Sequence, residues 1–368
     1  MRLTAKCDVA LQQSFDQTIR LMKKTSRRTR NQMTMHDVAK LIGVSPMTVS
    51  RVLSAHPTVK KETREHVEQA IKKLGYAPNP AARRLAGAKA VRIGLVYNNP
   101  SVAYLNELLL GILDASDRLG CQIVLEKCGA RNVRQAIEKI LADGLDGVML
   151  PPPLSDSRQI IELLRSKNIP SIAIAGSPAD AAGLSIGVDN FEAARSMTKY
   201  LIALGHRDIA FIRGAPNQLA SAQRYAGFCA ALAEAGIELQ PARIKQGNFT
   251  YKSGLAAAEK LLATDNRPSA IFASNDDMAA ATIATAHRLH LDVPTALTVV
   301  GFDDTLLATT IWPPLTTIKQ PIATMAKKAM ELLVQEIRLR ATGKTSEPLQ
   351  QISKFSLIKR ESSASQSC

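Results

Sequence analysis

Three polar side chains on one face of a predicted helix are the residues of this chain best suited to binding chemistry. The helix covers 46–53; its apolar positions share one face, and Thr48, Ser50 and Arg51 share the other. An arginine fork can bind a guanine edge with two hydrogen bonds, and hydroxyls can donate to phosphate oxygens. The pattern therefore predicts a helix that enters the major groove of DNA.

The residues before this helix predict the element that holds it in place. Thr34 can accept a hydrogen bond as an N-cap, and the helix that follows ends at Gly43, which supplies the left-handed conformation. Ser45 can cap the second helix, and Pro46 occupies its first position, where a missing N–H costs nothing. Two short helices joined by a tight turn are typical of a helix-turn-helix. A third amphipathic helix is expected over 57–76.

The positive charge of the chain is concentrated in the same region. Residues 1–90 hold 18 Lys and Arg against 6 Asp and Glu, whereas the remaining residues hold 29 against 26. A basic segment binds phosphates and releases counterions, whatever the base sequence. A solvated basic face is the alternative, but the coincidence of the charge with the two-helix pattern favours DNA.

Two flanking segments extend this basic region. Residues 1–32 are polar and basic, and are expected to form a disordered extension or to precede the true start of translation. Over 79–90, Asn79 can cap a short hinge helix that carries Arg83 and one prominent apolar side chain, Leu85. A lone leucine on a basic helix suits a wedge in the minor groove, and an inert linker is the alternative.

From residue 91 onward, short β-branched runs alternate with amphipathic helices. This alternation predicts parallel sheets covered by helices on both faces, arranged in two doubly wound lobes with a cleft between them. The predicted strands are 91–97, 121–126, 145–150, 169–175, 184–188, 208–213, 269–274 and 297–302. The predicted helices are 103–119, 131–142, 156–167, 191–204, 220–235, 252–263, 277–289 and 323–340. Ligands of open α/β sheets bind outside the carboxyl ends of strands. That rule selects Asn98, Gly214, Asn275 and Asp303.

The bulk composition sets the class of protein. A chain of 368 residues suggests two or three domains, and 46% apolar residues suit a large core. No apolar run approaches the ~20 residues of a membrane helix, and the N-terminus lacks the apolar core of a signal peptide. The five cysteines form no CxxC pair, so reduced thiols and no metal site are expected. A cytoplasmic protein without a cofactor is the prediction.

Several motifs, taken together, resemble the lactose-repressor (LacI/GalR) family of bacterial transcription regulators over nearly all of residues 34–360. They are Asp37-Val38-Ala39, Thr48-Val49-Ser50-Arg51, Leu74-Gly75-Tyr76, Pro78-Asn79, Leu204-Gly205-His206, Arg224-Tyr225-Ala226-Gly227-Phe228, Asn275-Asp276, Gly301-Phe302-Asp303-Asp304 and Pro314-Leu315-Thr316-Thr317-Ile318. The resemblance implies a helix-turn-helix domain (33–78), a hinge helix (79–90) and a periplasmic-binding-protein-like effector domain (91–360). It implies a first lobe of about 91–188 and 317–343, a second lobe of about 189–316 and 344–360, and a disordered tail (361–368).

The resemblance also assigns roles in DNA binding. It places Pro46, Met47 and Arg51 at base-reading positions and Leu85 at the minor-groove lever, with two chains on one pseudo-palindromic operator. Neither Pro46 nor Met47 can donate a hydrogen bond from its side chain, although both can touch a thymine methyl. The resemblance makes Thr48, Ser50 and Thr63 phosphate contacts, and capping or solvent exposure is the alternative for each. The remaining candidates for DNA binding are Thr34, Ser45, Asn79 and Arg83.

For the cleft, the resemblance makes Arg224 and Asp303 the main effector ligands, because a fork and a carboxylate suit vicinal hydroxyls. A structural salt bridge is the alternative for this pair. For Asn275 the alternative is a strand-end turn, and for Phe249 it is a core aromatic. The weaker candidates are Asn98, Tyr104 and Gln320.

The chain departs from lactose repressors on the first lobe. Where they carry an Asn and an Asp, this sequence has Pro151-Pro152-Pro153 and Ala175. The expected effector is therefore a sugar or sugar derivative that is not lactose-like in detail, and induction by that sugar is the default. A purine or another metabolite acting as corepressor is the alternative.

Two rival functions belong to other classes. An α/β enzyme acting on sugars would need a phosphate-binding glycine loop, and neither GxGxxG nor GxxxxGK[ST] occurs. A nonspecific nucleoid protein would have no use for a large cleft domain. The preferred prediction is an allosteric repressor that acts as a homodimer, without the leucine heptads of a tetramerising coil.

Overall fold

The computed structural model describes residues 34–53, 59–74, 90–129, 132–175, 183–263 and 266–366. The chain divides into two compact units, Met1–Ala90 and Val91–Cys368, and each is treated by itself. Two predicted segments lie outside the described residues. They are the extension over 1–32 and the hinge helix over 79–90, with Asn79, Arg83 and Leu85; of the hinge helix, Ala90 alone is described. Within the described residues, no helix is long and apolar enough to cross a membrane.

The first unit is a three-helix cluster made of α2 (Met35–Ile42), α3 (Pro46–Leu53) and α4 (Lys61–Leu74). Its small core contains Val38, Ala39, Leu41, Val49, Val52, Val67 and Ala70. The third helix begins at Lys61 rather than at 57, because Val59 and Lys60 are not helical.

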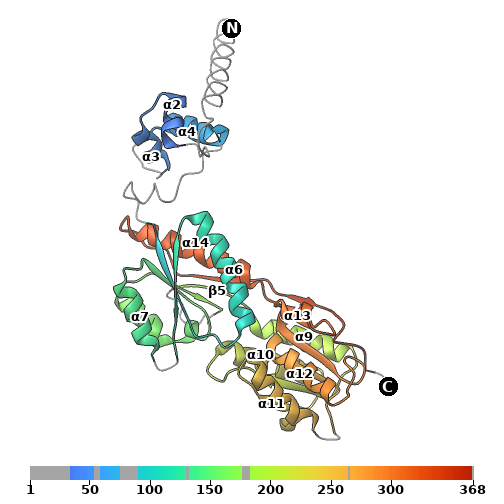
Figure 1. Ribbon diagram of the computed structural model, residues 1–368. Helices are drawn as coiled ribbons and strands as arrows, with labels where there is room; N and C mark the ends of the chain where they lie inside the picture. The colour runs from blue at the N-terminus through green and yellow to red at the C-terminus, as the bar shows by residue number, and fades with distance from the viewer. Residues whose placement is uncertain are drawn as a thin grey trace, which may run out of the picture. The chain divides into compact units, whose positions relative to one another are not determined.

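The second unit consists of two lobes, each built on a six-stranded sheet (Figure 1). Lobe 1 has the strand order β11-β5-β4-β3-β1-β2. Its elements are β1 (Arg92–Tyr97), α6 (Val102–Leu119), β2 (Gln122–Lys127), α7 (Val133–Ala142), β3 (Gly147–Leu150), η1 (Leu154–Asp156), α8 (Arg158–Ser166), β4 (Ser171–Ile174), β5 (Leu184–Val188), α14 (Ile322–Arg340) and β11 (Leu349–Ser353). All strand pairs of this sheet are parallel. One face packs on α6 and α14, and the other on α7 and α8.

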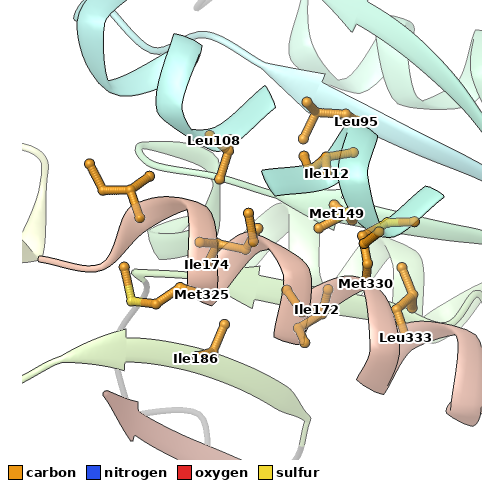
Figure 2. Close-up of a cluster of buried hydrophobic side chains, with 14 of the residues drawn as sticks. Leu95, Leu108, Ile112, Met149, Ile172, Ile174, Ile186, Met325, Met330 and Leu333 are labelled. Carbon is orange, nitrogen blue, oxygen red and sulfur yellow. The ribbon is translucent and has the colours of Figure 1, made fainter. Parts of the chain in front are cut away.

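The core under α14 shows why these residues form a layered fold. Met325, Met330 and Leu333 recur at helical spacing and point into a cluster that includes Ile172 and Ile174 of β4 (Figure 2). A fully buried aliphatic side chain contributes about 1.5–3 kcal/mol. The apolar face of α14 and the apolar residues of the strands beneath it are therefore buried in one core, which holds the helix on the sheet.

Lobe 2 has the strand order β12-β10-β9-β8-β6-β7, in which only β12 runs antiparallel to its neighbour. Its elements are α9 (Asn190–Ala203), β6 (Ile209–Arg213), α10 (Leu219–Glu234), η2 (Pro241–Arg243), β7 (Ile244–Gln246), α11 (Tyr251–Leu262), β8 (Ala270–Ala273), α12 (Asp276–Arg288), β9 (Thr298–Asp303), α13 (Leu307–Thr310), β10 (Thr316–Lys319) and β12 (Ser356–Ile358). Cores lie on both faces, one under α9 and α10 and one under α11 and α12. The predicted two-lobed α/β fold is confirmed.

The boundaries between the lobes differ from the prediction at two places. Residues 317–319 belong to lobe 2, because β10 pairs with β9. Residues 349–353 belong to lobe 1, because β11 pairs with β5 along its whole length. The chain thus adds β11 as the edge strand of the first sheet and returns to lobe 2 only at β12.

The predicted disordered tail is wrong as far as residue 366. Ser362 is fully buried, and its hydroxyl accepts from Thr316 N at 2.8 Å and donates to Val299 O at 2.6 Å. Gln366 N donates to Leu204 O at 2.8 Å. The serines that suggested a solvated tail instead satisfy backbone groups at the end of the second sheet.

Candidate DNA-binding surface and ligand cleft

Helix caps fix the geometry of the helix-turn-helix. The Thr34 hydroxyl accepts from Asp37 N, and Asp37 Oδ2 accepts from Thr34 N at 2.8 Å, which is a complete capping box. The hydrogen bonds from Thr34 lower the pKa of the Asp37 carboxyl. Gly43 ends α2 with φ +67°, and Ser45 Oγ accepts from Thr48 N at 3.1 Å. Thr34, Ser45 and Thr48 therefore have capping roles in addition to any contact with phosphate.

The candidate base readers lie on the solvent side of α3. Met47 is 63% exposed, and Arg51, one turn further along the same helix face, is also exposed. Pro46, Ser50 and Thr63 are half-buried. Val49 and Val52 are buried against α2 and α4, so the orientation of α3 is fixed. Met47 and Arg51 are therefore held together on its exposed face.

In the second unit, a cavity lies where the two lobes meet. Lobe 1 contributes Asn99, Ser101, Tyr104, Pro152 and Ala175, and lobe 2 contributes Gln218, Ala220, Arg224, Phe249, Asn275, Asp303 and Gln320. Six of the seven predicted effector residues line it, and the seventh, Asn98, is replaced by its neighbour Asn99. The strand-end rule located the edge of the sheet but not which of two adjacent asparagines faces inward.

Arg224 and Asp303 form a buried ion pair in the lobe 2 wall. The distance from Arg224 Nη1 to Asp303 Oδ1 is 3.5 Å, and both side chains are about 5% exposed. Arg224 Nε donates to Asn190 Oδ1 at 2.9 Å, and its guanidinium lies 3.5 Å from the ring centroid of Phe302. The fork is thus held in one orientation from three sides.

Burial sets the protonation of this pair. Burial raises the pKa of Asp303 to about 7, although Arg224 and the amide of Gln320, which donates at 2.6 Å, lower it. Burial also lowers the pKa of Arg224 and raises that of Asp276. A ligand hydroxyl that donates to Asp303 would favour its charged form.

Two polar atoms of the cavity wall are buried without a hydrogen-bond partner among the described residues, Tyr104 Oη and Gln320 Oε1. A buried polar atom left unpaired costs about 1–3 kcal/mol. Because these two atoms come from opposite lobes and line the same cavity, a ligand with hydroxyl groups could satisfy both.

Asn275 and Phe249 have structural roles beside their place in the cavity wall. Asn275 caps α12 by accepting from Met278 N at 3.1 Å, and its amide donates to Phe249 O at 3.0 Å. Phe249 is buried in the lobe 2 core with φ +66°. A Cβ on Gly214 would lie 1.9 Å from the Phe249 ring, so glycine at 214 makes room for it.

Within the described residues, two hydrogen bonds beside this cavity join the lobes. Ser101 Oγ donates to Asp277 Oδ2 at 2.6 Å, and Leu219 N donates to Asp156 Oδ2 at 3.0 Å. The cavity volume is about 30 Å³, far below the roughly 300 Å³ or more of a typical small-molecule site. A sugar ring therefore enters only if the lobes separate. Ser101, Gln218 and Asp277 were not predicted as cleft residues. Each lies at the start of a helix, where a polar side chain is ordinarily interpreted as a cap or as an acidic residue of the first turn.

A larger cavity of about 490 Å³ lies in lobe 1, between α8, α14 and strands β4 and β5. Its lining includes Ala173 and Gly183, and no ligand is assigned to it. His206 is structural: its ring nitrogens contact Ser269 Oγ and Ala364 O at 2.9 and 3.0 Å. Among the described residues, no group of three His, Cys, Asp or Glu side chains could hold a metal ion.

Comparisons with known proteins agree with both halves of the chain. Residues 34–79 match the family "Bacterial regulatory proteins, lacI family", and residues 198–363 match "Periplasmic binding protein-like domain". Catabolite control protein A of Priestia megaterium is 33% identical over 306 residues, which is 82% of this chain and 92% of that protein. The HTH-type transcriptional regulator CelR of Thermobifida fusca is 33% identical over 342 residues, 90% of this chain and 99% of that protein.

Two solved structures extend the comparison. The complex of the transcriptional regulator CelR with cellobiose has a TM-score of 0.68 and 32% identity, covering 90% of this chain and 99% of that one. The lac repressor dimer bound to operator and the anti-inducer ONPF has a TM-score of 0.68 and 29% identity, covering 91% of this chain and all of that one.

Proposed function

Since the chain belongs to the lacI family of bacterial regulatory proteins and is a DNA-binding transcription regulator, we propose that it represses its target genes as a homodimer on a pseudo-palindromic operator. A sugar or sugar derivative bound between the lobes controls its operator affinity. The cleft binds this effector without converting it.

The observation that carries the carbohydrate assignment is the buried Arg224–Asp303 pair beside Tyr104 Oη and Gln320 Oε1, which have no hydrogen-bond partner in the described part of the chain. A carboxylate and a guanidinium held side by side suit vicinal hydroxyls, because one accepts and the other donates. The related CelR structure holds cellobiose, which supports the same ligand class.

Lobe 1 is the part of the second unit that follows the DNA-binding unit along the chain, since β1 begins at Arg92. When an effector separates the lobes at the Ser101–Asp277 contact, lobe 1 shifts relative to lobe 2. In a homodimer that shift changes the spacing of the two DNA-binding units. The coupling is reciprocal, so operator binding changes effector affinity by the same factor.

Footprinting on genomic DNA, with and without a panel of sugars, tests the proposal. A short symmetric footprint that one sugar abolishes supports it. Coating without sequence preference would support a nucleoid protein, conversion of the sugar would support an enzyme, and protection that requires a purine would support a corepressed regulator.

Effector affinity is expected to depend on pH through Asp303. The pKa near 7 lies above the ordinary value of 3.8, so folding favours the protonated carboxyl, and its contribution to stability is lost as the pH rises from about 4 to 7. An effector that donates to the carboxylate releases this proton on binding. We expect affinity to fall about tenfold between pH 8 and pH 6. Calorimetry in buffers of different ionisation enthalpy measures the release, and equal affinity at both pH values would contradict the assignment.

The contact between the lobes is expected to oppose effector binding. Replacing Asp277 with alanine removes the acceptor of the Ser101 hydrogen bond and of a longer one from Asn275 Nδ2 at 3.2 Å. The Asn275 amide keeps its bond to Phe249 O, and Ser101 Oγ still caps α6 by accepting from Tyr104 N. Opening then costs about 1 kcal/mol less, and effector affinity rises about fivefold. Glu192→Ala, another first-turn acid, is the matched control and leaves affinity unchanged. Weaker binding by Asp277→Ala would show instead that the contact belongs to the bound state.

A further inference from the structure

The carboxylate of Asp303 reaches the cleft from a turn whose backbone conformation is unfavourable. We infer that Arg360, which follows β12, is a positioning residue that holds this turn and so places Asp303 against Arg224. The inference rests on the proposed role of Asp303 as an effector ligand. It adds a residue outside the cleft lining on which that role depends.

The turn at the end of β9 has two consecutive residues with positive φ, +119° for Asp303 and +56° for Asp304. Residues with side chains rarely adopt such a backbone, and it persists only where the surrounding structure holds it. The Asp303 carboxylate lies 3.5 Å from Arg224 Nη1 and accepts from the Gln320 amide at 2.6 Å. Both contacts depend on the direction in which the turn points this side chain, so the restraint on the turn sets the geometry of the cleft.

Arg360 restrains the turn through the side chain of Asp304. Its Nη2 lies 2.6 Å from Asp304 Oδ1, and its Nη1 donates to Leu315 O at 2.8 Å. The backbone of Arg360 is itself fixed, because its N–H donates to Thr316 Oγ1 of β10 at 2.8 Å. Lys319 also approaches Asp304, but at 3.4 Å and with a side chain that is 54% exposed, so it restrains the carboxylate less.

Asp276 holds the turn from its other side. Its Oδ2 accepts from Thr305 N at 2.8 Å, and its Oδ1 accepts from Thr317 Oγ1 at 2.6 Å. The two strained residues therefore lie between two holds. Without Arg360 the hold on Asp304 is weakened, so the turn opens more often and moves the Asp303 carboxylate away from Arg224.

A second ion pair of lobe 2 provides the matched control. Arg243 Nε donates to Asp208 Oδ1 at 2.6 Å, and the Arg243 side chain is 8% exposed. Asp208 precedes β6 and Asp303 ends β9, so the two pairs lie at opposite ends of one parallel sheet. Loss of either pair lowers the melting temperature, but only the loss of Arg360 reaches the cleft.

The experiment uses three variants of the full-length protein, Arg360→Met, Arg360→Lys and Arg243→Met. Methionine keeps an apolar stem and removes the donors, whereas lysine keeps a cation that can reach Asp304. The ligand is whichever of glucose, galactose, mannose and their methyl glycosides most raises the melting temperature of the native protein. Its affinity is measured by calorimetry below the melting temperature of every variant. We expect Arg360→Met to weaken binding about tenfold, Arg360→Lys to stay within about threefold of the native protein, and Arg243→Met to bind as the native protein does.

A second measurement needs no ligand. Hydrogen exchange of the peptide that contains Thr305 reports local opening of the turn, because the Thr305 amide is bonded to Asp276. We expect Arg360→Met to speed this exchange about tenfold, and Arg243→Met to leave it unchanged.

The possible failures are distinguishable. If Arg360→Met lowers the melting temperature as Arg243→Met does but leaves effector affinity unchanged, the inference is overturned, and Arg360 only stabilises the lobe. A loss of affinity that Arg243→Met shares in full also overturns it. If no sugar raises the melting temperature of the native protein, the carbohydrate effector falls, and hydrogen exchange alone decides whether Arg360 holds the turn.

Discussion

Replacing Arg224 with alanine is expected to abolish the response to effector and to destabilise the second unit by about 1–3 kcal/mol, because Asp303 then stays protonated and buried acceptors lose their donor. The same change removes the donors to Asn190 Oδ1 and Ser274 O. The readouts are the melting temperature and its increase with saturating effector. Operator binding at low temperature, where the protein stays folded, remains.

Arg224→Lys separates charge from geometry. Lysine keeps a cation near Asp303, but it loses the planar fork and its stacking on Phe302. We therefore expect most of the stability to return and the effector response to stay lost. A variant without Arg224 that still shifts its melting temperature with effector as the native protein does would show that the ion pair is purely structural.

Replacing Arg51 with alanine is expected to remove operator specificity. Arg51 is exposed on α3, in the first unit, and a bidentate contact with guanine contributes about 1–3 kcal/mol of discrimination. Specific affinity should fall about 5- to 150-fold, whereas nonspecific affinity should fall only slightly. Fluorescence anisotropy with operator and scrambled duplexes measures both.

Arg51→Lys and Lys40→Ala are the controls for this result. Arg51→Lys keeps the charge but not the fork, so it should also lose specificity. Lys40 is exposed near the end of α2, so its removal should weaken both duplexes equally. Equal losses on both duplexes for Arg51→Ala would assign Arg51 to phosphate binding rather than base reading.

Hydrophobic periodicity predicted the long helices of the second unit to within two residues at each end, whereas the helix expected over 57–76 begins four residues later, at Lys61. The helix expected over 323–340 is α14 (Ile322–Arg340), because Met325, Met330 and Leu333 repeat at its buried face. The short strands β7, β10, β11 and β12 were missed, because each contains at most two apolar residues and so forms no apolar run. β11 belongs to lobe 1 because it pairs with β5, at the edge of the first sheet. This pairing depends on the tertiary fold and not on the local sequence of β11.

The sequence predicted which residues line the cleft, but not which hydrogen bonds these residues make. Strand ends selected Asn275 and Asp303, and the family motifs selected Arg224. No sequence rule indicates that Asn190, on a helix 34 residues away, would accept from Arg224. The contact of Ser101 with Asp277 joins residues 176 positions apart, so it follows only from the closure of two lobes.

The most direct test of the account is operator affinity measured with the cleft empty and then saturated with the sugar or sugar derivative that most raises the melting temperature. We predict a change of at least about fivefold, which disappears in Arg224→Lys. An operator affinity that is the same with and without the bound effector would contradict the claim that the cleft controls DNA binding.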